Sequence, residues 1–221
     1  MPRVLHAPGE RSEVDHADKR FLGRKELHDV RLYACRGAAN KTRREDEMSG
    51  RLTFVPVDEM PDVPGLSVPD EIYWLLRRPT PLLGMARPTD RTPWSTLRGL
   101  GVRRVICLAD ERPRYDPSPL SLAGAFGLQD LYGGIAPLEP ELEHGRVLAA
   151  ARATLAQLRR GDGVVVHCAG GTGRTGTVLG ATLIALGFGA AEVIVHLEAL
   201  HARRNRTWPE SPWQAEFLRS L

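Results

Sequence analysis

One stretch of the sequence, Val164 to Thr175, constrains the fold of this chain more than any other. Three consecutive valines that run into His167 and Cys168 have the composition and length of a buried strand. The five residues after the cysteine include three glycines, and an apolar helical pattern begins after Arg174. We therefore expect a strand, a tight glycine-rich loop and a helix in direct succession.

The loop in this stretch suits an anion such as a phosphoryl group. Glycine has no Cβ, so the backbone N–H groups of the loop can turn inward around a bound anion. The helix that follows presents its positive N-terminal end to the same point. Arg174 can bind two phosphate oxygens with its flat guanidinium group, and this positive field favours a nucleophilic thiolate at Cys168. The expected phosphate-binding residues are Ala169, Gly170, Gly171, Thr172, Gly173 and Arg174.

The ordered pattern His167-Cys168-x5-Arg174-Thr175 resembles that of the protein tyrosine phosphatase superfamily. Within that superfamily it is most similar to the small atypical dual-specificity phosphatases, over roughly residues 72–221. The resemblance implies that Cys168 is the catalytic nucleophile and that Arg174 binds the phosphoryl group. It also implies that His167 orders the loop and helps to keep Cys168 ionised, and that Thr175 hydrogen-bonds to the thiolate.

A phosphatase of this kind also needs an acid that protonates the departing oxygen. In the resembled family an aspartic acid lies on a loop some thirty to forty residues before the cysteine. Asp130 lies 38 positions before Cys168, and the glycines that follow it suit a mobile loop. We therefore predict Asp130 as the catalytic acid, with Asp110, Glu111 and Asp116 as alternatives. The resemblance also suggests Gln214 as a residue that positions the hydrolytic water.

The rest of the sequence predicts an α/β fold with a central, mostly parallel sheet flanked by helices, because strand and helix patterns alternate. In such sheets ligands bind beyond the carboxyl ends of the strands, which is where Cys168 falls. The expected strands cover residues 72–76, 81–85, 105–108, 126–131 and 164–166. The expected helices cover residues 140–161, 175–186 and 190–203, and a last one begins near Ser211.

The chain divides near Gly50. Residues 1–50 are rich in both charge signs and lack a sustained apolar period, so we expect a charged, poorly ordered N-terminal extension. Residues 51–221 have the pattern of a dual-specificity-phosphatase-like catalytic domain. A short amphipathic piece over residues 21–33 is too small to build a core alone.

Composition limits the compartment and the partners. The three cysteines, Cys35, Cys107 and Cys168, are odd in number and widely spaced, which favours a reducing, cytoplasmic environment over a disulfide framework. The sequence has no apolar run long enough for a bilayer and no secretory signal core, so we expect no membrane association. The net charge of +3 is too small to indicate nucleic-acid binding. We expect the protein to be a monomer. We also expect it to use no metal or cofactor, because the loop and Arg174 supply the positive charge that a metal ion would otherwise provide.

These observations favour a metal-independent phosphatase that hydrolyses phosphate monoesters through a cysteinyl-phosphate intermediate. A phosphoprotein carrying phosphotyrosine and phosphoserine or phosphothreonine is the favoured substrate, and the absence of lysine from the loop disfavours inositol lipids. The alternatives are an enzyme acting on RNA, a nucleotide or a small phosphorylated metabolite, and a non-catalytic phosphate-binding module. Sulfur transferases usually have a shorter loop, and arsenate reducers of similar spacing carry the cysteine near the N-terminus, so both fit less well.

Overall fold

The structure is a computed structural model that describes residues 52–221. The expected N-terminal extension over residues 1–50, its amphipathic piece over residues 21–33, and Cys35 lie outside the described residues. Among the described residues, no helix is both long and apolar enough to span a bilayer.

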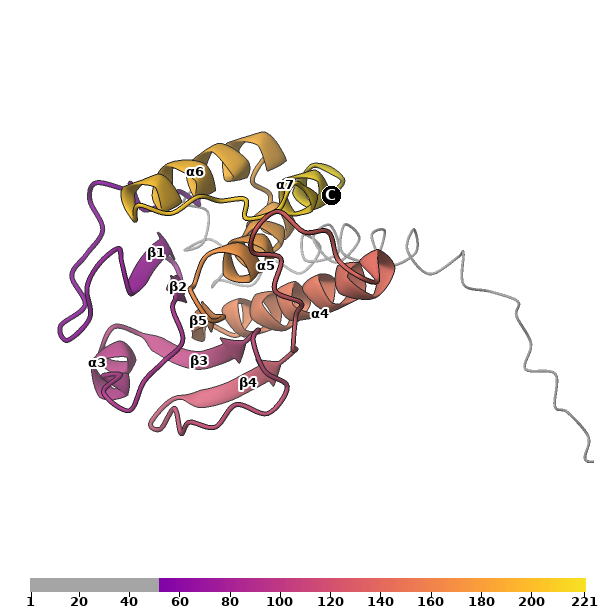
Figure 1. Ribbon diagram of the computed structural model, residues 1–221. Coiled ribbons are helices and arrows are strands. Elements are labelled where there is room, and N and C mark those ends of the chain that lie inside the picture. Colours follow the sequence, from indigo (N-terminus) through magenta and orange to yellow (C-terminus); the bar gives the residue numbers. More distant parts are fainter. Residues whose placement is uncertain (1–51) are drawn as a thin grey trace, which may run out of the picture.

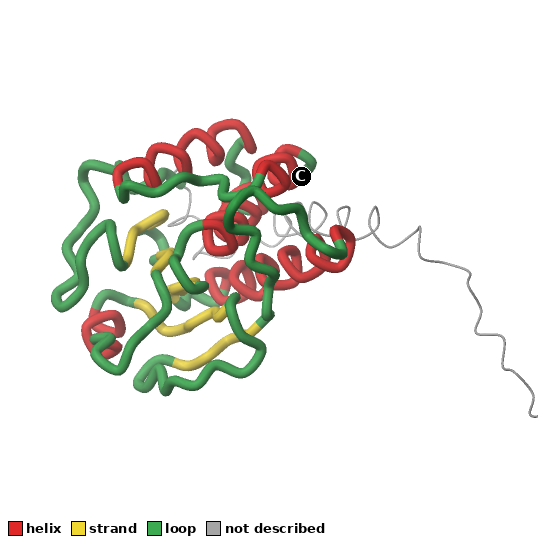
Figure 2. Tube along the Cα trace, in the orientation of Figure 1, coloured by secondary structure: helices red, strands yellow, loops and turns green. Residues whose placement is uncertain are grey.

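Five strands of the described chain form one sheet in the order β1-β2-β5-β3-β4 (Figures 1 and 2). The strands are β1 (Ile72–Leu76), β2 (Leu82–Met85), β3 (Val102–Cys107), β4 (Ser121–Ala125) and β5 (Gly163–His167). Strand β1 runs antiparallel to β2, and every other neighbouring pair is parallel. The predicted mostly parallel sheet is confirmed, and its middle strand, β5, is the one that leads into the glycine-rich loop.

The strand predicted over residues 126–131 is wrong. The edge strand β4 lies just before it, over Ser121–Ala125, and residues 126–131 form a loop. The apolar side chains of Leu128 and Leu131 favoured a strand at that position, but they are buried as anchors of the loop. The true strand consists mostly of small residues and is only partly buried, because an edge strand pairs on one side alone.

Helices cover both faces of the sheet, as predicted, but unequally. One face packs against the short helix α3 (Trp94–Gly99) and against apolar residues of the segment that precedes β1. The other face carries α4 (Pro140–Arg159) and α5 (Gly173–Ala185), with α6 (Ala190–Arg203) and α7 (Pro212–Arg219) packed against α5. Figure 1 shows α5 between the sheet and the outer helices.

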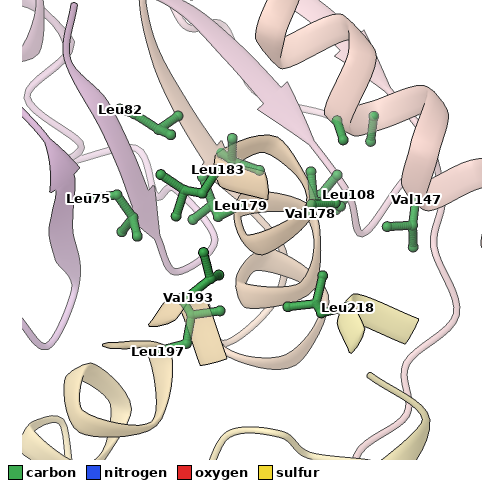
Figure 3. Packing of buried hydrophobic residues seen from close by; sticks show 14 of the residues in the cluster. Leu75, Leu82, Leu108, Val147, Val178, Leu179, Leu183, Val193, Leu197 and Leu218 are labelled. Carbon is green, nitrogen blue, oxygen red and sulfur yellow. The ribbon is translucent and has the colours of Figure 1, made fainter. Parts of the chain in front are cut away.

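The apolar pattern of β5 explains why both faces are covered. Successive side chains of a strand point to opposite faces. Accordingly Val164 and Val166 join the core under α4 and α5, while Val165 joins the core under α3. Helix α5 is buried continuously from Gly173 to Leu183, so the loop before it is anchored between two rigid elements. Figure 3 shows the apolar residues around α5, among them Leu75, Leu82, Leu108, Val147, Val178, Leu179, Leu183, Val193, Leu197 and Leu218.

Candidate active site

The glycine-rich loop lies at the carboxyl end of β5, where the sequence predicted it. Cys168 follows the last residue of the strand and is 3% exposed. The backbone N–H of Gly171 donates a hydrogen bond to the Cys168 sulfur over 3.2 Å. The loop ends where α5 begins, at Gly173, so the positive end of a buried helix faces the same region. The Gly171 N–H and the positive end of α5 thus both favour a negative charge on the sulfur.

Gly171 is the position at which this loop requires glycine. Its φ of +66° is in the left-handed region that residues with a Cβ rarely adopt. A Cβ there would also lie 2.5 Å from the carbonyl carbon and oxygen of Met85, at the end of β2. The loop therefore passes so close to the neighbouring strand that no larger residue fits without moving backbone.

His167 is buried and connects the loop to a neighbouring loop. Its Nδ1 donates to the carbonyl oxygen of Cys168 over 3.2 Å, and the Tyr115 hydroxyl donates to its Nε2 over 2.5 Å. Burial lowers the pKa of His167 to about 4, so the ring is neutral at neutral pH. His167 therefore acts on the loop through orientation rather than through a positive charge. Tyr115 was not predicted from the sequence.

Arg174 and Asp130 come together, although 44 residues separate them. Arg174 Nη2 donates to Asp130 Oδ2 over 2.7 Å, and Nη1 donates to the carbonyl oxygen of Leu128 over 3.3 Å. The Arg174 side chain is 10% exposed, whereas that of Asp130 is 54% exposed. An ion pair with one partner so exposed contributes only about 0–1 kcal/mol. A bound phosphate, which offers two oxygens to the same guanidinium, can therefore replace the Asp130 carboxylate.

The three alternative acids lie elsewhere. Asp110 pairs with Arg87 over 2.9 Å. Asp116 accepts a hydrogen bond from the backbone N–H of Ser118. Glu111 packs against Gly127, outside the ion pair formed by Arg174. Among the predicted acids, Asp130 is the one that contacts the loop arginine.

The two remaining predicted residues differ in how they meet the loop. Thr175 is fully buried, and its hydroxyl has no hydrogen-bond partner among residues 52–221, so the predicted bond to the Cys168 sulfur is not formed in this structure. Gln214 is 1% exposed and accepts hydrogen bonds through Oε1 from the N–H groups of Glu210 and Ser211. Its Nε2 lies 2.7 Å from the point where a Cβ of Gly173 would be. Gln214 therefore lies against the start of α5, and its role in positioning the hydrolytic water stays a prediction.

Glu210 is a site residue that the sequence did not reveal. One of its carboxylate oxygens lies 2.0 Å from the point where a Cβ of Gly173 would be, at the start of α5. Burial, followed by the charge of Asp130, raises the pKa of Glu210, while the N–H of Gly173 and the charge of Arg174 act in the opposite direction. No sequence pattern distinguished it, because a glutamate in a loop is ordinarily a surface residue.

A cysteine in a glycine-rich loop, at the carboxyl end of the central strand and followed by an arginine on a buried helix, defines the class of cysteine-based phosphatases. A family model described as "PTP-SAK: Swiss Army Knife protein, DSP-PTPase phosphatase domain" matches residues 71–210. That match covers more than half of the chain, so the protein belongs to this family, and the resemblance inferred from the loop is confirmed.

The solved structures that match this chain have low sequence identity and TM-scores below 0.5. TpbA of P. aeruginosa is 18% identical, with a TM-score of 0.48, over 67% of this chain and 84% of that one. DUSP15 is 17% identical, with a TM-score of 0.46, over 73% and 85% of the two chains. The catalytic core of the PP-IP phosphatase SIW14 from S. cerevisiae is 13% identical, with a TM-score of 0.45, over 62% and 78%. A comparison with curated proteins found no match.

Proposed function

We propose that this protein is a metal-independent phosphatase of phosphoproteins, acting on phosphotyrosine and on phosphoserine or phosphothreonine through a cysteinyl-phosphate intermediate. The observation that carries the proposal is the position of the Cys168 sulfur. The sulfur accepts a hydrogen bond from the N–H of Gly171. It lies at the end of β5, and the loop that follows leads to Arg174 on the buried helix α5. A nucleophile and the groups that bind a phosphoryl oxygen thus occupy one site.

In the first step the phosphate monoester binds to the loop N–H groups and to Arg174, which releases Asp130 from its ion pair. The Cys168 thiolate attacks phosphorus, and the bond from phosphorus to the leaving oxygen breaks. Asp130, in its protonated form, gives its proton to that oxygen. In the second step Asp130 takes a proton from water as the water oxygen attacks phosphorus. The sulfur–phosphorus bond breaks, and thiolate and inorganic phosphate are produced.

A protein substrate is supported by the surface beside Asp130. Tyr132, Ile135 and Leu138 follow it on the same loop and are 75%, 51% and 87% exposed. Exposed apolar side chains on the loop that carries Asp130 suit contact with a polypeptide better than contact with a small polar metabolite. We further propose a cytoplasmic enzyme, because a free thiol at Cys168 persists in a reducing compartment.

The first test is turnover of p-nitrophenyl phosphate with EDTA present. Cys168→Ser should abolish phosphate release but retain binding of a phosphopeptide, measured by calorimetry. Asp130→Ala should slow turnover most for esters with poor leaving groups. It should also flatten the alkaline limb of the kcat/KM profile, because a general acid must be protonated to act and is lost as the pH rises. Phosphate release by Cys168→Ser at the wild-type rate would contradict the proposal. Binding without turnover by the wild-type protein would instead indicate a phosphate-binding module.

The second test identifies the substrate class. Phosphopeptides, RNA ends, nucleotides and sugar phosphates are compared by kcat/KM under one set of conditions. We expect phosphopeptides to have the highest value. A higher kcat/KM for a nucleotide or metabolite than for every phosphopeptide would contradict the phosphoprotein proposal and favour the alternative substrate class.

A further inference from the structure

A buried arginine lies directly behind the loop. Arg204 follows α6 and is 4% exposed. Its Nη1 donates to the carbonyl oxygen of Gly171 over 2.8 Å, and its Nη2 donates to those of Gly170 and Asp70 over 3.2 and 2.9 Å. Within residues 52–221, no carboxylate forms an ion pair with it. A buried cation without a carboxylate is costly. Its charge therefore suggests an anion on the other side of the loop.

Two aromatic residues fix this arginine and the same carbonyl. The Tyr73 hydroxyl donates to the carbonyl oxygen of Gly171 over 2.9 Å, and the Arg204 guanidinium carbon lies 4.6 Å from the centroid of the Tyr73 ring. Arg204 Nη1 also donates to His201 Nδ1 over 2.8 Å. Burial lowers the pKa of His201 to about 3, so its ring is neutral and can accept this bond. The Gly171 carbonyl is thus held by two buried donors.

Because of the geometry of the peptide bond, these contacts with the carbonyls also fix the direction of the N–H groups of the loop. In a trans peptide the C=O and N–H groups point in opposite directions. Arg204 holds the Gly170 carbonyl on the outside, so the N–H of Gly171 points inward, where it meets the Cys168 sulfur. The held Gly171 carbonyl likewise turns the N–H of Thr172 inward. The positive φ of Gly171 lets these successive N–H groups face the same side, as in an anion-binding nest.

We propose that Arg204, together with Tyr73, is a positioning residue for the Cys168 chemistry. It holds two carbonyls outside the loop, so that the N–H groups face the sulfur and the phosphoryl group, and its buried charge stabilises the thiolate. This inference rests on the proposed function. Arg204 lies at the C-terminal end of α6, and its guanidinium group lies behind the loop.

The experiment makes two measurements on each variant. The first is the rate at which iodoacetamide alkylates Cys168 as a function of pH, followed by peptide mass spectrometry. The second is the kcat for hydrolysis of p-nitrophenyl phosphate. The variants are Arg204→Met, Arg204→Lys and Tyr73→Phe. Arg203→Met is the matched control, because Arg203 is the preceding residue but is exposed and pairs with Asp58. Alkylation does not require turnover. Failure of the wild-type protein to hydrolyse esters would therefore contradict the proposed function. The effect of Arg204 on the Cys168 thiolate could still be tested by alkylation.

In Arg204→Met the midpoint of the alkylation profile should rise by about one pH unit, because the thiolate loses a buried positive charge and an aligned donor. Its kcat should fall roughly tenfold to hundredfold, as expected when a nucleophile is misplaced. Arg204→Lys should keep the midpoint within about half a unit, because the charge remains. It should lose turnover, because an ammonium group cannot hold both carbonyls in a fork.

A folded Arg204→Met variant with the midpoint and kcat of Arg203→Met would overturn the proposal. If Arg204→Met does not fold, Tyr73→Phe and Arg204→Lys decide the question. Tyr73→Phe keeps the ring and removes one donor to Gly171, and we expect it to lower kcat about threefold to tenfold. Wild-type kcat in both of these variants would equally refute the role of Arg204 and Tyr73.

Discussion

Replacing Gly171 with alanine tests the structure of the loop. At φ +66° an alanine costs about 1–2 kcal/mol relative to glycine. The added Cβ would lie 2.5 Å from the carbonyl of Met85 and 2.6 Å from the nitrogen of Ala86, both of which are backbone atoms of a packed segment. Forcing a methyl group into a well-packed site adds about 1–3 kcal/mol. We therefore expect Gly171→Ala to lower the free energy of unfolding by roughly 2–5 kcal/mol.

For a domain of this size that loss corresponds to a fall in Tm of about 4–20 °C. The neighbouring glycine is the matched control, because the φ of Gly170 lies outside the left-handed region. A Cβ there would meet only side-chain atoms, Arg206 Nη1 at 3.2 Å and Thr172 Oγ1 at 3.9 Å. Gly170→Ala should therefore stay within about 0.5 kcal/mol of the wild type. Both variants are measured by calorimetric thermal unfolding and by kcat/KM. Equal Tm values for the two variants would show that the loop does not press against β2 as the structure has it.

Two further predictions concern pH and substrate contact. His167 and His201 are buried and neutral, with pKa values of about 4 and about 3, so below pH 6.5 the unfolded chain binds protons that the folded chain does not. Stability should fall as the pH falls from 6.5 towards 4, by about 2 kcal/mol for each histidine between pH 7 and 5. Urea unfolding should show this, and a pH dependence unchanged in His167→Gln would contradict it. Tyr132→Ala combined with Leu138→Ala should raise KM for a phosphoprotein but not for p-nitrophenyl phosphate, and an equal effect on both would count against a protein-docking role.

The sequence was most informative where the chemistry is local. The loop from Cys168 to Arg174 is contiguous, so its strand, its turn and its helix could be predicted together and its family inferred. Asp130 could be selected only through its spacing in the resembled family, because nothing in the residues around it distinguishes a catalytic aspartate from an ordinary turn residue. The edge strand β4 was misplaced, because its small, half-exposed residues carry a weaker apolar pattern than the buried loop beside it.

Residues that meet the loop from other segments could not be predicted, because their partners depend on how the chain is folded in space. Tyr115 reaches His167 across 52 residues, and Tyr73 reaches Gly171 across 98. The position of Tyr73 depends on its pairing with Gly84 across β1 and β2, since a Cβ at Gly84 would lie 2.2 Å from the Tyr73 ring. Such a pair can be recognised only when the strand register is known.

The same long-range contacts determine what a phosphate ester must displace on entry. Asp130 accepts a hydrogen bond from Arg174, and the Glu210 carboxylate lies against Gly173 at the start of α5. The groups that would bind phosphate are thus in contact with carboxylates of the protein itself. On binding of a phosphate ester, Arg174 would exchange one exposed carboxylate for a bidentate phosphate, and this exchange would favour binding. Glu210 is less exposed than Asp130, and its pKa is raised first by burial and second by the charge of Asp130. Because a phosphate dianion would add a further negative charge, its binding favours the protonated form of Glu210. Phosphate binding at Arg174 would then be accompanied by proton uptake at Glu210.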